Sequence, residues 1–169
     1  MAKTFSLITP QDIVSTTSWI VASGGVGTIA SGTPAEGADA AAASPWTGAV
    51  VPMADGEGST SQRFTGIAKN TSTDTASAAG TVTLFDPLPG LMYKGFAKTA
   101  STADTAAEVQ ALQGKRVLFD LTSTDWTVDA AATDAVANCV VIAGGDYQTQ
   151  TLNFYYASKG TWIGFVISA

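Results

Sequence analysis

From residue 48 onward, the chain is divided into short apolar-rich runs that recur roughly every ten residues. Gly, Pro, Asp and Ser separate the runs. Regular short strands punctuated by turn-forming residues are typical of an all-β barrel or sandwich. The predicted strands cover 48–53, 62–69, 80–86, 91–98, 115–122, 125–129, 137–143, 149–157 and 161–168.

Several of these runs alternate in the way that a half-buried strand requires, because successive side chains point to opposite faces of a sheet. In the run 149–157, one face carries Leu152, Phe154 and Tyr156, and the other carries Thr151, Asn153 and Tyr155. The same alternation predicts shared faces for Val117, Phe119 and Leu121, and for Ile163, Phe165 and Ile167.

One helix is expected, over 103–113. Thr105 and Glu108 have the spacing of a capping box, in which each side chain bonds the other residue's backbone N–H. Val109 and Leu112 are three residues apart and would face the core.

The first part of the chain has a different composition. Residues 31–46 contain no large apolar side chain before Trp46, so burial there offers little to offset the entropy of ordering. We therefore expect an extended N-terminal arm and low-complexity loop over 1–47, followed by a β-domain over 48–169. Deleting 36–43 should change the free energy of unfolding by less than about 1 kcal/mol. The predicted fold is mainly β, a compact β-barrel or sandwich with one short helix and this arm.

The composition argues against an enzyme. The chain has no histidine, one cysteine and 13% charged residues. Histidine is the usual general base at neutral pH and the commonest metal ligand. Cys139 lies in an apolar run, has no histidine to activate it, and is expected to be buried and inert. We predict no catalytic residue, no cofactor and no bound metal.

Carboxylates are the remaining candidates for chemistry, and they fall into three groups. Asp74 and Asp104 each begin an Asp-Thr-Ala triplet, as in aspartic proteases, but both follow polar linkers and not apolar strands. Residues 55–59 space oxygen ligands as calcium loops do, without the distant bidentate Glu. The third group surrounds Trp126 and fits turn formers better than a glycosidase pair; its members are Asp125, Asp129 and Asp134.

The net charge of the chain limits the classes of partner that it could bind. The net charge is −6 and the sequence pI is about 4.3, so phosphate backbones and anionic membrane surfaces would repel the chain. Neither a secretion signal nor an apolar stretch of membrane-spanning length is visible. We expect a protein that is made in a cytoplasm and binds neither nucleic acid nor membrane.

Three segments carry a resemblance to a known family: GLMYKGFAKTA at 90–100, VLFDLTSTDWTVD at 117–129 and VVIAGGD at 140–146. Together with the low-complexity N-terminal portion, they resemble the capsid decoration, or cement, proteins of tailed bacteriophages. The similarity lies in the general character of the sequence, a β-domain of short strands rich in Thr, Ala and Gly, and it spans about 48–168. It implies a homotrimer on the outer surface of an icosahedral head, where it bridges capsomers of the major capsid protein and stabilises the shell.

The residues expected at the capsid or protomer interface are Phe5, Leu7 and Ile8 as anchors of the arm, together with Trp46, Tyr155 and Trp162. Removing residues 1–16 should then weaken capsid attachment and leave the β-domain folded. Two alternatives stay open: a carbohydrate-binding or host-recognition module that uses exposed Trp and Tyr, and a structural component of a tail or baseplate.

Overall fold

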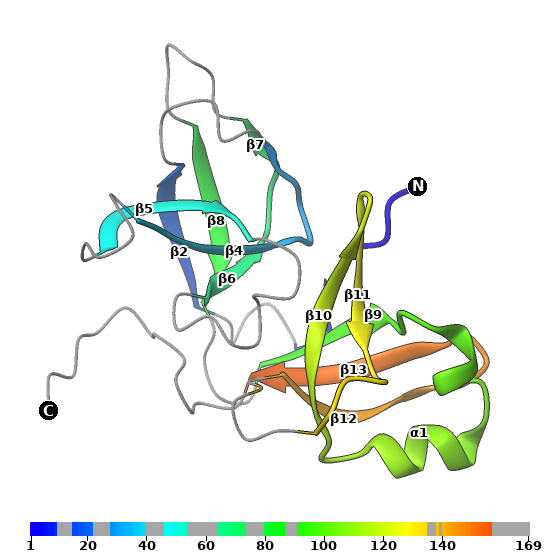
Figure 1. The fold of residues 1–169 in the computed structure, drawn as a ribbon. Coiled ribbons are helices and arrows are strands. Elements are labelled where there is room, and N and C mark those ends of the chain that lie inside the picture. Colours follow the sequence, from blue (N-terminus) through cyan, green and yellow to red (C-terminus); the bar gives the residue numbers. More distant parts are fainter. Residues whose placement is uncertain are drawn as a thin grey trace, which may run out of the picture.

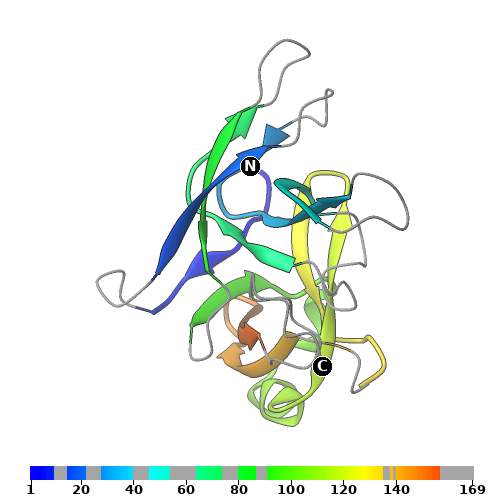
Figure 2. The same cartoon turned by 90° about the vertical axis from the view of Figure 1, so that its left-hand side faces the viewer.

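A computed structural model shows a mainly β protein, as the sequence predicts, with one α-helix among the residues that it describes (Figure 1). The strands form a closed barrel and a second, curled sheet, which lie one above the other (Figures 1 and 2). The residues that the structure describes are 1–9, 15–21, 28–39, 46–53, 64–73, 80–86, 91–134, 138 and 140–156.

Five strands close the barrel in the order β2-β5-β4-β6-β8, and β8 pairs with β2. They are β2 (Thr16–Val21), β4 (Pro34–Asp39), β5 (Trp46–Pro52), β6 (Phe64–Ala68) and β8 (Thr81–Phe85). All neighbours are antiparallel except β2 and β5. A small separate ladder joins β3 (Thr28–Ile29) to β7 (Ser72–Thr73). The barrel interior holds a cluster of mostly small apolar side chains: Val21, Ile29, Ala35, Val50, Ala68, Val82 and Leu84.

Strand β4 corrects the prediction of an N-terminal arm. It lies in the region expected to be a loop, yet Ala35 is fully buried and Glu36 is only 8% exposed. Strand β5 also crosses the predicted boundary between residues 47 and 48. The prediction failed because hydropathy favours large side chains, whereas small residues fill the interior of a narrow barrel and the ladders with β5 and β6 satisfy the backbone. Deletion of 36–43 is now expected to disrupt the barrel.

The curled sheet has six strands in the order β1-β9-β13-β12-β10-β11. They are β1 (Ser6–Leu7), β9 (Met92–Phe96), β10 (Arg116–Thr122), β11 (Asp125–Asp129), β12 (Val140–Asp146) and β13 (Thr151–Tyr156). The sheet curls far enough for Ala97, just after β9, to form a parallel bridge with Val128 of β11. The N–H of Lys98 then donates to the Val128 carbonyl at 2.9 Å.

Helix α1 (Ala106–Leu112) follows a single 3-10 turn, η3 (Ala100–Thr102), and lies beside β12 (Figure 1). The predicted capping box is present: the Thr105 hydroxyl accepts from the Glu108 N–H, and the Glu108 carboxylate accepts from the Thr105 N–H. Val109 and Leu112 are buried, as expected from their spacing.

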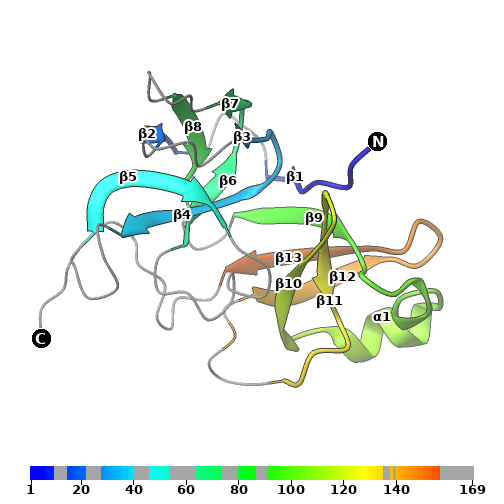
Figure 3. The same cartoon turned by 45° about the horizontal axis from the view of Figure 1, so that its top comes forward.

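The N-terminal segment connects the two sheets. Strand β1 pairs with β9, and Figure 3 shows it between the barrel and β9. The Phe5 N–H donates to the Gly32 carbonyl at 2.8 Å, in the loop before β4. On the side of the curled sheet, the backbone N–H of Trp126 donates to the Lys3 carbonyl at 2.9 Å. Residues 3–8 are thus part of the folded body.

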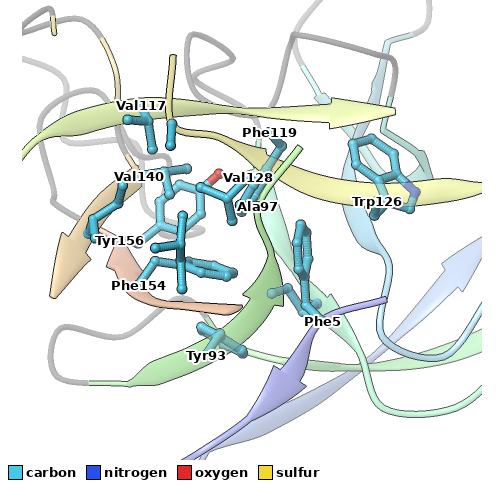
Figure 4. Packing of buried hydrophobic residues seen from close by; sticks show 14 of the residues in the cluster. Phe5, Tyr93, Ala97, Val117, Phe119, Trp126, Val128, Val140, Phe154 and Tyr156 are labelled. Atoms are coloured by element: carbon cyan, nitrogen blue, oxygen red, sulfur yellow. The ribbon is translucent and has the colours of Figure 1, made fainter. Parts of the chain in front are cut away.

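The larger of the two apolar clusters among the described residues lies inside the curled sheet and extends to the barrel. Its centre is aromatic: the Phe5 ring is 4.6 Å from Phe119 and 5.1 Å from Phe154, centroid to centroid (Figure 4). The same cluster includes three side chains from the barrel side: Met53, which follows β5, Ile67 of β6 and Phe85 of β8. The two sheets therefore share buried apolar contacts.

Candidate interaction surface

Phe5 is an internal residue. Its side chain is 3% exposed and packs directly on Gly95, where a Cβ atom would lie only 2.6 Å from the Phe5 Cδ1. The sequence predicted Phe5 as an anchor of the arm at the capsid or protomer interface; in the folded chain its side chain lies in the core instead. A large apolar residue in this part of the sequence could either bind a partner or pack into the core of its own chain. Only the tertiary structure distinguishes these two roles.

Its neighbours follow the alternation of an edge strand. Leu7 lies opposite Tyr93 and packs against the core cluster. Ile8 follows in the same ladder, where its N–H donates to the Met92 carbonyl at 2.8 Å, and its side chain is 43% exposed. Of the three predicted arm anchors, Ile8 has the most exposed side chain.

A row of apolar side chains crosses three strands on the outside of the curled sheet. Met92 of β9 lies directly opposite Tyr155 of β13, and Ile8 lies beside Met92 in the ladder. Tyr93 and Phe154 point into the core, so Met92 and Tyr155 point outward. Both are half-buried. We call Ile8, Met92 and Tyr155 the outer row; it unites two residues that the sequence predicted as interface residues.

The outer row belongs to a face with few charges. On the same side, Ser6 lies opposite Lys94, which lies opposite Asn153. Next along β9 is Phe96, which is 39% exposed, and the Lys3 ammonium lies 5.5 Å from its ring centroid. We call the outward side of β1, β9 and β13 the outer face. None of these three strands contains Asp or Glu.

Asp146, at the end of β12, marks the margin of the outer face, because it lies opposite Thr151. Hydrogen bonds from the Thr149 hydroxyl and the Gln148 N–H lower the pKa of Asp146, and the charge of Lys94 lowers this pKa further. The carboxylate is therefore ionised near neutral pH and sits at the edge of the face, outside its centre.

The remaining predicted residues are not placed. Trp46 begins β5 and lies opposite Asp39, but its side chain is outside the described part, as are Trp162 and Cys139. Conversely, sequence reasoning missed Met92, Lys94 and Phe96 as members of the outer face. Their period-two spacing was visible, but a Met and a Phe in a strand give no sign of which face is inward.

The carboxylates near Trp126 have structural partners. The Lys98 ammonium lies 2.7 Å from Asp120 and 3.2 Å from Asp129. Burial raises the pKa of Asp120, but hydrogen bonds from Lys98 and Thr122 outweigh it and hold the pKa below its usual value. The hydrogen bonds to Asp120 and Asp129 raise the pKa of Lys98. The network ties the segment after β9 to the β10–β11 hairpin.

The other Asp residues of that group accept backbone hydrogen bonds. Asp125 accepts from the Lys3 N–H at 2.9 Å, and Asp134 accepts from the Arg116 N–H at 3.1 Å. These contacts favour the turn-and-cap interpretation over a glycosidase pair. Asp104 lies just before the helix cap, whereas Asp74 and the loop 55–59 are outside the described residues.

Within the described ranges, no group of three or more Cys, Asp or Glu side chains is arranged to hold a metal ion. No described helix combines the length and the hydropathy needed to cross a membrane. No protein-family model, curated protein or solved structure matches this chain significantly.

Proposed function

We propose that this protein is a capsid decoration protein of a tailed bacteriophage. In this proposal it attaches, as a homotrimer, to the outer surface of the icosahedral head and bridges capsomers formed by the major capsid protein. The three segments that resemble such proteins support the proposal, and the outer face is the observation that carries it: partly exposed apolar side chains with polar residues beside them on the same strands.

The chemistry of the outer face suits binding to another protein. Interfaces bury an apolar centre within a polar rim and are depleted of charge at that centre. Ile8, Met92 and Tyr155 would form such a centre, with Ser6 and Asn153 beside it. A backbone held in a sheet needs little ordering on binding, so less entropy opposes association.

A protein that fills the junction between capsomers adds buried surface that the undecorated shell lacks. Because it binds the assembled shell and not the separated subunits, mass action favours the assembled state. The net charge of −6 fits a position outside the shell, away from packaged DNA.

The test is sedimentation of the full chain with phage heads. Purified protein is mixed with undecorated heads of the phage that encodes it, the heads are pelleted, and the bound protein is measured against free concentration. We expect saturable binding and a higher disruption temperature of the heads. Heads that already carry the protein are the control and should bind no more. Absence of saturable binding to undecorated heads would rule the proposal out.

One observation favours a second candidate, a carbohydrate-binding module. Phe96 and Tyr147 are 39% and 43% exposed, and both lie at the end of the sheet where β12 turns into β13. Exposed aromatic rings are the side chains on which sugars stack. Binding of a glycan that is lost in Tyr147→Ala, together with failure to bind heads, would favour this candidate.

A further inference from the structure

We infer that the outer face is the surface that contacts the shell, and that its counterpart there is an apolar ridge bordered by carboxylates. The inference rests on the proposed function and goes further, because it selects one face of the protein and states the chemistry of the surface it fits.

The apolar part of the argument comes from the outer row. Neighbouring strands lie about 4.8 Å apart, so three adjacent strands present a strip about 10 Å wide. Ile8 at its edge is 43% exposed, and Met92 and Tyr155 are half-buried. Methionine adapts its shape to an opposing surface, and tyrosine combines apolar area with a hydroxyl, so both suit an interface.

The electrostatic part comes from the local balance of charge. The whole chain carries −6, yet β1, β9 and β13 contain Lys94 and no carboxylate, and the Asp146 carboxylate of neighbouring β12 lies at the margin of the face. Lys94 lies between the outer row and Phe96, and a second cation, Lys3, lies over the Phe96 ring. A partner with carboxylates beside its apolar ridge would complement this face, whereas a basic partner would be repelled.

The same charges argue against contact between two copies through identical faces. An isologous contact places the same patch of both copies together, so the two Lys94 side chains would lie on the same small interface. Like charges brought together there oppose association. The outer face therefore suits a different, acidic surface.

The test uses two pairs of matched variants in the pelleting experiment. Ile8→Asp is compared with Ile20→Asp, because Ile20 is an even more exposed isoleucine, at 60%, on strand β2 of the barrel. Lys94→Glu is compared with Lys69→Glu, since both change the net charge equally and Lys69 lies after β6 of the barrel. We expect Ile8→Asp and Lys94→Glu to weaken head binding by at least about tenfold, and the two barrel variants by less than about twofold.

Salt dependence and oligomeric state complete the test. Binding of the unaltered chain should weaken as salt is raised, and binding of Lys94→Glu should depend less on salt. Far-UV circular dichroism and the melting temperature confirm that each variant folds, and sedimentation velocity records its assembly state.

The outcomes separate the two claims. If the unaltered chain fails to bind heads, the proposed function fails and this inference fails with it. If the chain binds and all four variants bind equally well, the function stands and the choice of face is wrong. If Lys94→Glu binds more tightly, the partner is not acidic. If Ile8→Asp changes the assembly state, the face joins copies of this chain, which also overturns the inference.

Discussion

Phe5 occupies its place because residue 95 has no side chain. The ring packs against Gly95, and a Cβ atom there would approach the Phe5 Cδ1 to 2.6 Å and Cε1 to 2.8 Å. Such distances are far inside van der Waals contact, so the ring would have to move into the neighbouring aromatic side chains Phe119 and Phe154.

We therefore predict that Gly95→Ala lowers the free energy of unfolding by about 2 kcal/mol through overpacking. Urea denaturation of the variant and the unaltered protein measures this difference in the free energy of unfolding. In a Phe5→Leu background, the smaller side chain should relieve the clash, and the same substitution should cost at least about 1 kcal/mol less. If the costs of the two substitutions simply add, Gly95 and Phe5 are not coupled as the structure indicates.

Tyr93 carries a polar group in an apolar site. The residue is 1% exposed, and its hydroxyl has no hydrogen-bond partner among the described residues. Burial, with a smaller contribution from the charge of Asp86, raises the pKa of Tyr93, so the phenol stays neutral. A buried hydroxyl without a partner loses its hydration and gains nothing in exchange.

Tyr93→Phe should therefore raise the free energy of unfolding by about 1 kcal/mol. Tyr147→Phe is the matched control, since Tyr147 is 43% exposed and its change should stay within about 0.5 kcal/mol. Equilibrium unfolding in urea compares the two. A clear loss of stability in Tyr93→Phe would show that the hydroxyl has a stabilising partner.

At the scale of elements, the Lys98–Asp120–Asp129 network joins the segment after β9 to the β10–β11 hairpin and supports the curl of the sheet. The pKa of Asp120 is lower in the folded protein than in the unfolded chain. Its ionised form therefore contributes stability above the unfolded pKa, and this contribution is lost as the pH falls through the folded pKa.

Asp120→Asn should accordingly lower the free energy of unfolding by about 1 kcal/mol at pH 7, a modest value because the Lys98 side chain is 40% exposed and screened. The difference from the unaltered protein should shrink as the pH falls below about 4. Urea unfolding at several pH values measures it. In a Lys98→Gln background the pH dependence of the difference should be smaller; an unchanged dependence would exclude Lys98 as its cause.

At the scale of the whole molecule, one core couples the barrel to the curled sheet. Phe5 belongs to the cluster that contains Met53, Ile67 and Phe85 from the barrel side, and its N–H bonds the loop before β4. The expectation that removing 1–16 leaves a folded β-domain must be revised, because the deletion removes Phe5 and β1 from this core.

Phe5→Ala should lower the free energy of unfolding by about 3–5 kcal/mol. Because the cluster is shared, both sheets should still unfold in one transition. Native-state hydrogen exchange measures the protection of backbone amides in each sheet, near Trp19 in the barrel and near Trp126 in the curled sheet. Loss of protection in the curled sheet alone would show that the two sheets unfold independently.

Local patterns were sufficient to predict several strands after residue 48 and the helix. The runs 80–86, 115–122 and 125–129 nearly coincide with β8, β10 and β11, and the Thr105–Glu108 cap was located from its spacing. These features depend on residues two to four positions apart, where alternation and hydrogen-bonding reach are visible in the chain itself.

Tertiary structure decided how those elements are used. Small residues over 34–39 became a barrel strand because distant β5 and β6 closed around them. Phe5 turned inward and Ile8 outward because β1 paired with β9 in one particular register, and a shift of one residue would have reversed both. The outer row brings together residues 8, 92 and 155, which lie far apart in the sequence. No local pattern predicts that they are neighbours, because the pairing of distant strands decides which face of each strand is buried.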